Sequence, residues 1–168
     1  MNIKQINTMP RDELLIEFEK CCGSSAWVEK MVNSRPFYNV DSLHETSDKI
    51  WSGLSSKDYL EAFTHHPQIG DVNSLKEKFA STANWAGNEQ KGTSEASDEV
   101  LQKLKAGNDA YLKRFGFIFI VCATGKTAQQ MLDLLNDRLP NDTAIELHNA
   151  AAEQNKITHL RLNKLLSD

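Results

Sequence analysis

Apolar residues recur three and four positions apart along nearly the whole chain, and this spacing constrains the fold more than any other feature. An α-helix has 3.6 residues per turn, so side chains spaced in this way line one face that can be buried. Two patterns typical of a helix start, a Ser or Thr followed three residues later by Glu or Gln, occur at Ser42 and Thr127. The spacing predicts helices in the regions 14–22, 42–54, 55–63, 98–115, 127–139 and 141–165.

Only Phe117 to Ala123 has the aromatic and β-branched composition of a strand. One strand alone cannot form a sheet, so we interpret this run as an extended segment. Residues 80–97, which are rich in Gly and small polar side chains, form the clearest predicted loop, and no repeat or linker divides the chain. The predicted fold is therefore all-α: residues 1–168 form a single compact helical domain with one extended segment threaded through the core.

Composition and charge exclude several classes of protein. The hydrophobic fraction of 40% and the charged fraction of 25% are ordinary for a globular protein. The net charge of -4 is spread along the chain, without the basic stripe that a nucleic-acid-binding protein needs. No apolar run reaches the length of a membrane span, and the charged first 17 residues lack the apolar core of a signal peptide. We expect a cytoplasmic protein with no nucleic-acid or membrane partner.

The first candidate site is the turn around His65, His66 and Pro67, which is followed by Gly70. A residue before proline is disfavoured in helical backbone geometry, so His66 is held by a stiff turn. Gly70 permits a close backbone approach or a positive φ. Such a turn could fix an imidazole at the rim of a pocket. A helix-terminating turn with both histidines in water has the same spacing.

The second candidate site lies in the predicted loop, where Glu89 and Gln90 follow Trp85 and Gly87. A carboxylate beside an amide could bind a polar heterocycle through hydrogen bonds, with the indole ring as a wall. An ordinary solvated loop would have the same composition.

The third candidate site is the segment from Tyr111 to Ala123. Extended backbone in a helical protein has N–H and C=O groups that need partners, and a flat urea-like ligand could supply them. The alternative is a purely hydrophobic core segment.

No metal or cofactor motif stands out. Gly125-Lys126-Thr127 resembles the end of a phosphate-binding loop, but Ile120 stands where that loop needs its first glycine. The adjacent His65 and His66 point in different directions on most backbones, and no His-Glu-x-x-His spacing occurs. The three cysteines lack zinc-type spacing and are expected to be small packing residues. We therefore expect neither a metal nor a cofactor.

Taken together, these segments resemble the OHCU decarboxylase family, whose members act on 2-oxo-4-hydroxy-4-carboxy-5-ureidoimidazoline. The resemblance extends over nearly the whole chain and preserves the order and spacing of the motifs. The matching segments are Arg35-Pro36-Phe37, the turn from His66 to Gly70, the pair Glu89-Gln90, the run from Phe115 to Ala123, and the stretch from Glu153 through Ile157 to Arg161-Leu162.

The resemblance implies decarboxylation of this substrate to (S)-allantoin in urate degradation, by an all-helical, cofactor-free enzyme that usually forms homodimers. It implies catalytic roles for His66, Glu89 and Arg161. One departure is Ala86, where the family often has a serine, which removes a hydroxyl contact to the substrate but leaves backbone contacts possible. The implied substrate-binding residues are Pro67, Ala86, Gly87, Asn88, Glu89, Gln90, Phe119, Ile120, Val121, Cys122 and Ala123.

These residue types suit the implied chemistry. The substrate carries its carboxylate next to a C=N bond that can receive the electrons released by CO2, so it supplies its own electron sink. His66 would carry the proton near neutral pH, and Glu89 would orient the imidazole or the ureido group. Arg161 would position the substrate through its planar fork rather than clamp the departing carboxylate. A non-catalytic binding module and a metal-dependent hydrolase are the competing hypotheses.

Overall fold

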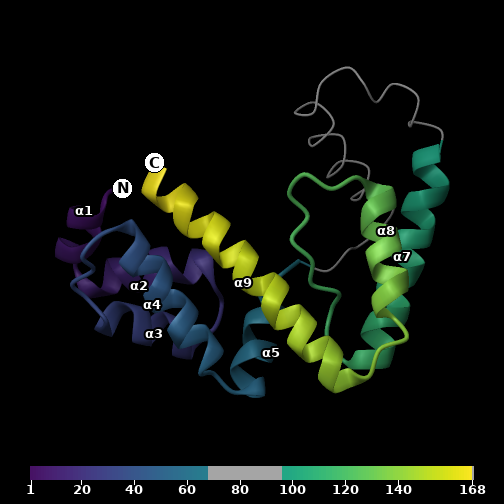
Figure 1. Ribbon diagram of the computed structural model, residues 1–168, viewed down its shortest axis with the longest axis horizontal. Coiled ribbons are helices and arrows are strands. Elements are labelled where there is room, and N and C mark those ends of the chain that lie inside the picture. Colours follow the sequence, from purple (N-terminus) through teal and green to yellow (C-terminus); the bar gives the residue numbers. More distant parts are fainter. Residues whose placement is uncertain (68–95, 168) are drawn as a thin grey trace. The chain divides into compact units, whose positions relative to one another are not determined.

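The computed structural model describes residues 1–67 and 96–167 (Figure 1). Within these ranges the protein has eight α-helices and no β-strand, which confirms the all-α prediction. None of the described helices is long and apolar enough to cross a membrane. The helices are α1 (Ile3–Thr8), α2 (Arg11–Cys21), α3 (Ser25–Asn33), α4 (Val40–Ser52), α5 (Ser56–Thr64), α7 (Ala96–Phe115), α8 (Ala128–Arg138) and α9 (Thr143–Ser167).

The chain forms two compact units. Unit 1 consists of residues 1–66 and 149–168, and unit 2 of residues 67–148. Helix α9 runs through the boundary, so its first turns belong to unit 2 and the remainder to unit 1. The single domain expected for residues 1–168 stays a prediction.

The helix starts follow from their capping residues. Thr127 caps α8 as predicted: its hydroxyl accepts from the Gln130 N–H at 3.2 Å, and the Gln130 side chain accepts from the Thr127 N–H at 2.9 Å. The start of α4 was predicted at Ser42 but lies earlier. Asn39 is the N-cap and accepts from the Ser42 N–H at 2.8 Å, which places Ser42 inside the first turn.

Two helices were not predicted from the sequence. Helix α1 has only six residues, too few for a periodic pattern, and begins at a capping box formed by Asn2 and Gln5. Helix α3 has a clear apolar face with Trp27, Val28 and Met31 buried, so the sequence does contain a helical signal there.

Helix α3 is central to the core of unit 1 and packs against α2, α4 and α5. Trp27 is fully buried; its ring meets Phe18 of α2 edge-on at 5.8 Å, and its indole N–H donates to Ser47 of α4 at 3.2 Å. The Trp51 indole N–H donates to the Ala151 carbonyl at 2.9 Å. This last bond attaches α4 to α9.

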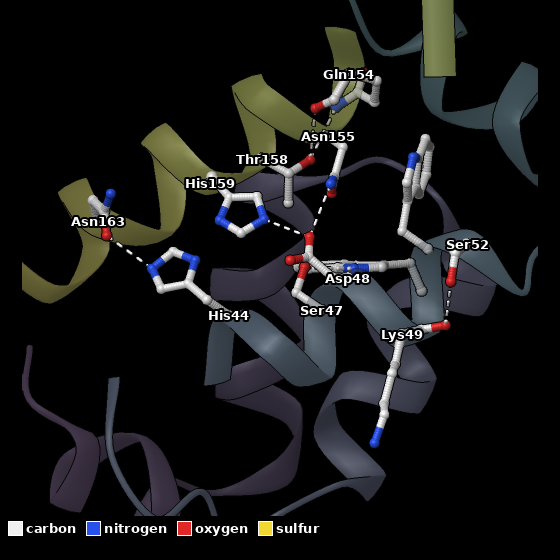
Figure 2. A network of polar contacts seen from close by, with 12 residues as sticks. His44, Ser47, Asp48, Lys49, Ser52, Gln154, Asn155, Thr158, His159 and Asn163 are labelled. Carbon is white, nitrogen blue, oxygen red and sulfur yellow. Dashed lines mark hydrogen bonds and ion pairs between the residues drawn. The ribbon is translucent and has the colours of Figure 1, made fainter. Parts of the chain in front are cut away.

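Polar contacts on the outside of unit 1 also join α4 to α9 (Figure 2). Asp48 accepts from His159 at 2.6 Å and from Asn155 at 2.8 Å. The rings of His44 and His159 stack at 4.6 Å, and His44 contacts Asn163 at 2.8 Å. These contacts hold one side of α9 against α4.

In unit 2, α7 packs closely on α8. Gly107 permits this approach, since a Cβ there would collide with the Leu135 side chain. Gly116, at φ 79°, ends α7 by donating its N–H to the Leu112 carbonyl at 2.8 Å. The residues that follow, 117–123, are neither helix nor strand, and Phe117, Phe119, Ile120 and Cys122 bury their side chains.

Candidate active site

The candidate histidines lie in the turn that follows α5. His65 is the C-cap of this helix, and its N–H donates to the Ala62 carbonyl at 3.2 Å. The N–H of His66 donates to the Phe63 carbonyl at 3.2 Å. His65 therefore closes the helix.

The two imidazoles contact different groups within unit 1. The His65 ring lies directly against Gly23, where any Cβ would collide with it. His66 is half-buried, and its Nε2 contacts Oε1 of Gln154 on α9. Adjacent residues of the turn thus place one ring on the segment between α2 and α3 and the other on α9. The two side chains thus point in different directions, as expected for these adjacent residues.

Gln154 is itself part of a buried polar chain on α9. Gln154 is 0% exposed and Thr158 1% exposed. The Gln154 side-chain amide donates to the Thr158 hydroxyl at 3.2 Å, and this hydroxyl donates to the Gln154 carbonyl at 3.1 Å. Figure 2 shows both side chains on one side of α9. His66 is therefore attached to a side chain whose own position is held by a second hydrogen bond.

Arg161 lies on the same face of α9 as Gln154, two turns further along, or about 10 Å by the rise of an α-helix. It is half-buried, and its guanidinium donates to the Cys21 carbonyl at 3.5 Å. Arg161 is thus packed against the end of α2, so it is not a fully solvated helical arginine.

The cysteines beside Arg161 are packing residues. Burial raises the pKa of Cys21 to about 12 and that of Cys22 to about 11, while the nearby Arg161 charge opposes the shift in both. Both thiols stay protonated at neutral pH and are poor nucleophiles. Cys122 is also buried, and all three thiols are free. The expectation that they are small packing residues is confirmed.

The segment from Phe119 to Ala123 belongs to unit 2 and is held by two basic side chains. Arg138 donates to the Ile120 carbonyl at 2.7 Å, and its guanidinium stacks 4.6 Å from the Phe119 ring centroid. Lys126 donates to the Cys122 carbonyl at 2.8 Å. The Ile120 and Cys122 carbonyls, which could have faced a ligand, thus already accept hydrogen bonds from protein side chains. The neighbouring Val121 and Ala123 are half-buried.

Arg138 is fixed in turn by the buried carboxylate of Glu146. Glu146 is 0% exposed and accepts from Arg138 Nε at 2.9 Å, from Asn141 at 2.9 Å and from the Tyr111 hydroxyl at 2.5 Å. Burial, and then the bond to Glu146, raise the pKa of Tyr111, so the phenol stays protonated and donates. A carboxylate buried so deeply is tolerated because these three partners all donate hydrogen bonds to it.

Pro67, another predicted site residue, is exposed at the end of the described turn. The remaining predicted substrate-binding residues lie outside the described residues: Ala86, Gly87, Asn88, Glu89 and Gln90.

In the described part of the chain, no three or more His, Cys, Asp or Glu residues gather as metal ligands would.

Sequence reasoning did not assign Gln154, Arg138 or Glu146 to any site. A signal existed for Gln154, because it falls at helical spacing between Ala151 and Thr158 on the apolar face of the last helix. A polar side chain on such a face needs a buried partner. The sequence does not say that the partner is His66.

Comparisons with known proteins agree with this architecture. Residues 7–163 match the family model described as OHCU decarboxylase. The chain is 40% identical over 90% of its length to the uric acid degradation bifunctional protein TTL of Arabidopsis thaliana, of which it spans 47%. It is 27% identical to the 2-oxo-4-hydroxy-4-carboxy-5-ureidoimidazoline decarboxylase of Haloferax volcanii, covering 99% of this chain and 97% of that protein.

The fold is similar to that of a solved structure of an OHCU decarboxylase crystallised in the presence of (S)-allantoin. The TM-score is 0.72 and the sequence identity 39%, covering 90% of this chain and 98% of the other.

Proposed function

Because the chain belongs to the OHCU decarboxylase family, we propose that it converts 2-oxo-4-hydroxy-4-carboxy-5-ureidoimidazoline to (S)-allantoin, as part of urate degradation. The family match over nearly the whole chain carries this proposal. His66 contacts Gln154 of α9, Arg161 belongs to α9, and both side chains are half-buried. They supply a proton carrier and a planar cation, two groups that the reaction can use.

The reaction needs proton handling more than it needs a cofactor. The bond from the ring carbon to the carboxylate breaks, and its electrons form a double bond to the neighbouring carbon, which carries the ureido group. The C=N electrons move onto nitrogen, which takes a proton. The hydroxyl then loses its proton to become a carbonyl, and the ureido-bearing carbon gains one. Protonation of that carbon on a single face gives the (S) product.

We assign the proton transfer to His66, since imidazole titrates near neutral pH. Arg161 positions a ring oxygen of the substrate through its planar guanidinium. Glu89 orients the ureido group or the imidazole. The residues 86–90 and 119–123 complete the substrate contacts in this proposal, and Ala86 contributes only its backbone.

The test is to add purified protein to freshly generated substrate and follow the product by circular dichroism. The expected result is faster decay and optically active (S)-allantoin, undiminished by a strong chelator. Spontaneous decay to racemic product would overturn the proposal. Activity abolished by the chelator would identify a metal-dependent hydrolase, and substrate binding without turnover would identify a binding module.

We further propose that the protein is a cytoplasmic homodimer, as the family resemblance implies. Multi-angle light scattering of the purified protein is expected to give twice the 18.9 kDa chain mass. Fractionation of the native cells is expected to place the protein in the cytoplasm.

A further inference from the structure

The buried contacts of Gln154 determine which end of its amide faces His66. The Thr158 hydroxyl has one proton, which it donates to the Gln154 main-chain carbonyl at 3.1 Å. At the Gln154 side chain this hydroxyl can therefore only accept. The amide NH2 must face Thr158, at 3.2 Å, and Oε1 must face His66.

The Cys22 sulfur is the other acceptor near the Thr158 hydroxyl, whose proton would lower the pKa of that thiol. A main-chain carbonyl is a stronger acceptor than sulfur, so the Thr158 proton stays on the Gln154 carbonyl. A flipped Gln154 amide would place two oxygens against each other in a fully buried position.

The orientation of the amide determines the tautomer of His66. An amide oxygen only accepts, so the ring nitrogen that it contacts, Nε2, must carry a proton. A neutral imidazole has a single N–H, and its lone pair then lies on Nδ1.

We infer that Gln154 is a positioning residue that holds neutral His66 as its Nε2–H tautomer, so that protons pass between this histidine and the substrate through Nδ1. The inference rests on the proposed function, in which His66 is the proton carrier. It adds the atom through which the proton moves and the residue that selects this atom.

The tautomer can be measured without turnover. In protein labelled with ¹⁵N-histidine, two-bond ¹H–¹⁵N spectra at a pH above the ring titration distinguish the two neutral forms. The expected wild-type signal for His66 is a protonated Nε2 and an unprotonated Nδ1. A protonated Nδ1, or an equal mixture, would overturn the inference even if the enzyme is fully active.

Variants connect the tautomer to the reaction. Gln154→Met keeps the volume and removes the acceptor, so the His66 tautomers should mix and kcat should fall roughly 10- to 100-fold with little change in KM. Gln154→Glu keeps an acceptor and adds a charge that favours the imidazolium. It should retain the tautomer and most of the activity, with the pH profile of kcat/KM displaced to higher pH.

The matched control is Gln102→Met, because Gln102 is exposed on α7 and should leave the activity and the His66 spectrum unchanged. If Gln154→Met does not fold, Thr158→Val, which removes the hydroxyl that orients the amide, should mix the tautomers in the same way. Unaltered kcat and pH profile in folded Gln154→Met would refute the inference. An inactive wild type with the Nε2–H signal would refute the proposed function alone.

Discussion

At the scale of single residues, His65 and His66 differ in what their rings contact. His66 meets the buried Gln154 of α9, whereas His65 lies on Gly23 and caps α5. We expect His66→Ala to fold and to lose about 10²- to 10⁴-fold in turnover, the usual cost of removing a proton-transfer group. His65→Ala should lose under about 1 kcal/mol of stability, through the helix end, and little turnover.

Steady-state kinetics measures the turnover of the two variants, and urea denaturation measures their stability. If both lose turnover equally, or if His65→Ala loses more, His66 is not the proton carrier and the roles of the two histidines are reversed.

Arg161 is the second residue whose role a substitution can test. Its guanidinium is half-buried beside the Cys21 carbonyl, so a planar fork is held near the face of α9 that carries Gln154. An ammonium cannot reproduce that fork. Arg161→Lys should therefore impair turnover along with Arg161→Ala, by roughly 10-fold or more if a bidentate contact worth 1.5–3 kcal/mol is lost. Wild-type kinetics in both variants would assign Arg161 to packing only.

At the scale of elements, the outer contacts between α4 and α9 depend on pH. Burial favours the neutral form of Asp48, but hydrogen bonds from Asn155 and His159, with the His159 and His44 charges, outweigh it and lower the pKa of Asp48 below 3.8. A lowered folded-state pKa gives stability that is complete above the ordinary value and is lost as the pH falls through the folded-state pKa.

We therefore expect Asp48→Asn to destabilise the protein at pH 7 by less than about 1 kcal/mol, because the pair is half exposed and screened. The difference from wild type should vanish as the pH falls through the lowered pKa and the wild-type carboxylate becomes protonated. Thermal denaturation of both proteins from pH 7 into this acid range measures the difference. Asp133→Asn on α8, which takes no part in these contacts, is the matched control, and a difference that does not shrink with falling pH would contradict the assignment.

A second group of contacts at the element scale holds the non-helical residues 119–123 of unit 2. Arg138 donates hydrogen bonds to Glu146 and to the Ile120 carbonyl. These bonds join the start of α9, the end of α8 and residues 119–123. A non-helical backbone needs such external donors, because it has no internal ladder of hydrogen bonds.

At the scale of the whole molecule, α9 contributes residues to both compact units. A helix that continues through the boundary couples the folding of its two ends. We expect the wild-type chain to unfold in one transition, with equal calorimetric and van't Hoff enthalpies, as one domain does. His148→Pro, at the boundary, should break the helix and split the transition, whereas His148→Ala should not. Two wild-type transitions would show that the units are separate domains.

The sequence by itself determined the helical fold class and much of its local detail. Local patterns predict three of these features, because each depends on residues within one helical turn of each other: the apolar spacing, the Thr127 cap and the His66-Pro67 turn. The same logic failed at α1, which is too short to show a period, and at the start of α4, where Asn39 caps ahead of Ser42.

Only the tertiary structure decided the partners of the site residues. His66 and Gln154 are 88 positions apart, and Arg138 reaches the Ile120 carbonyl from another helix. The sequence around His66 or Arg138 does not indicate which residue each contacts, because such contacts depend on how the helices pack. Many polar side chains could serve as partners locally, and the packing of the helices brings only one of them, Gln154, to His66.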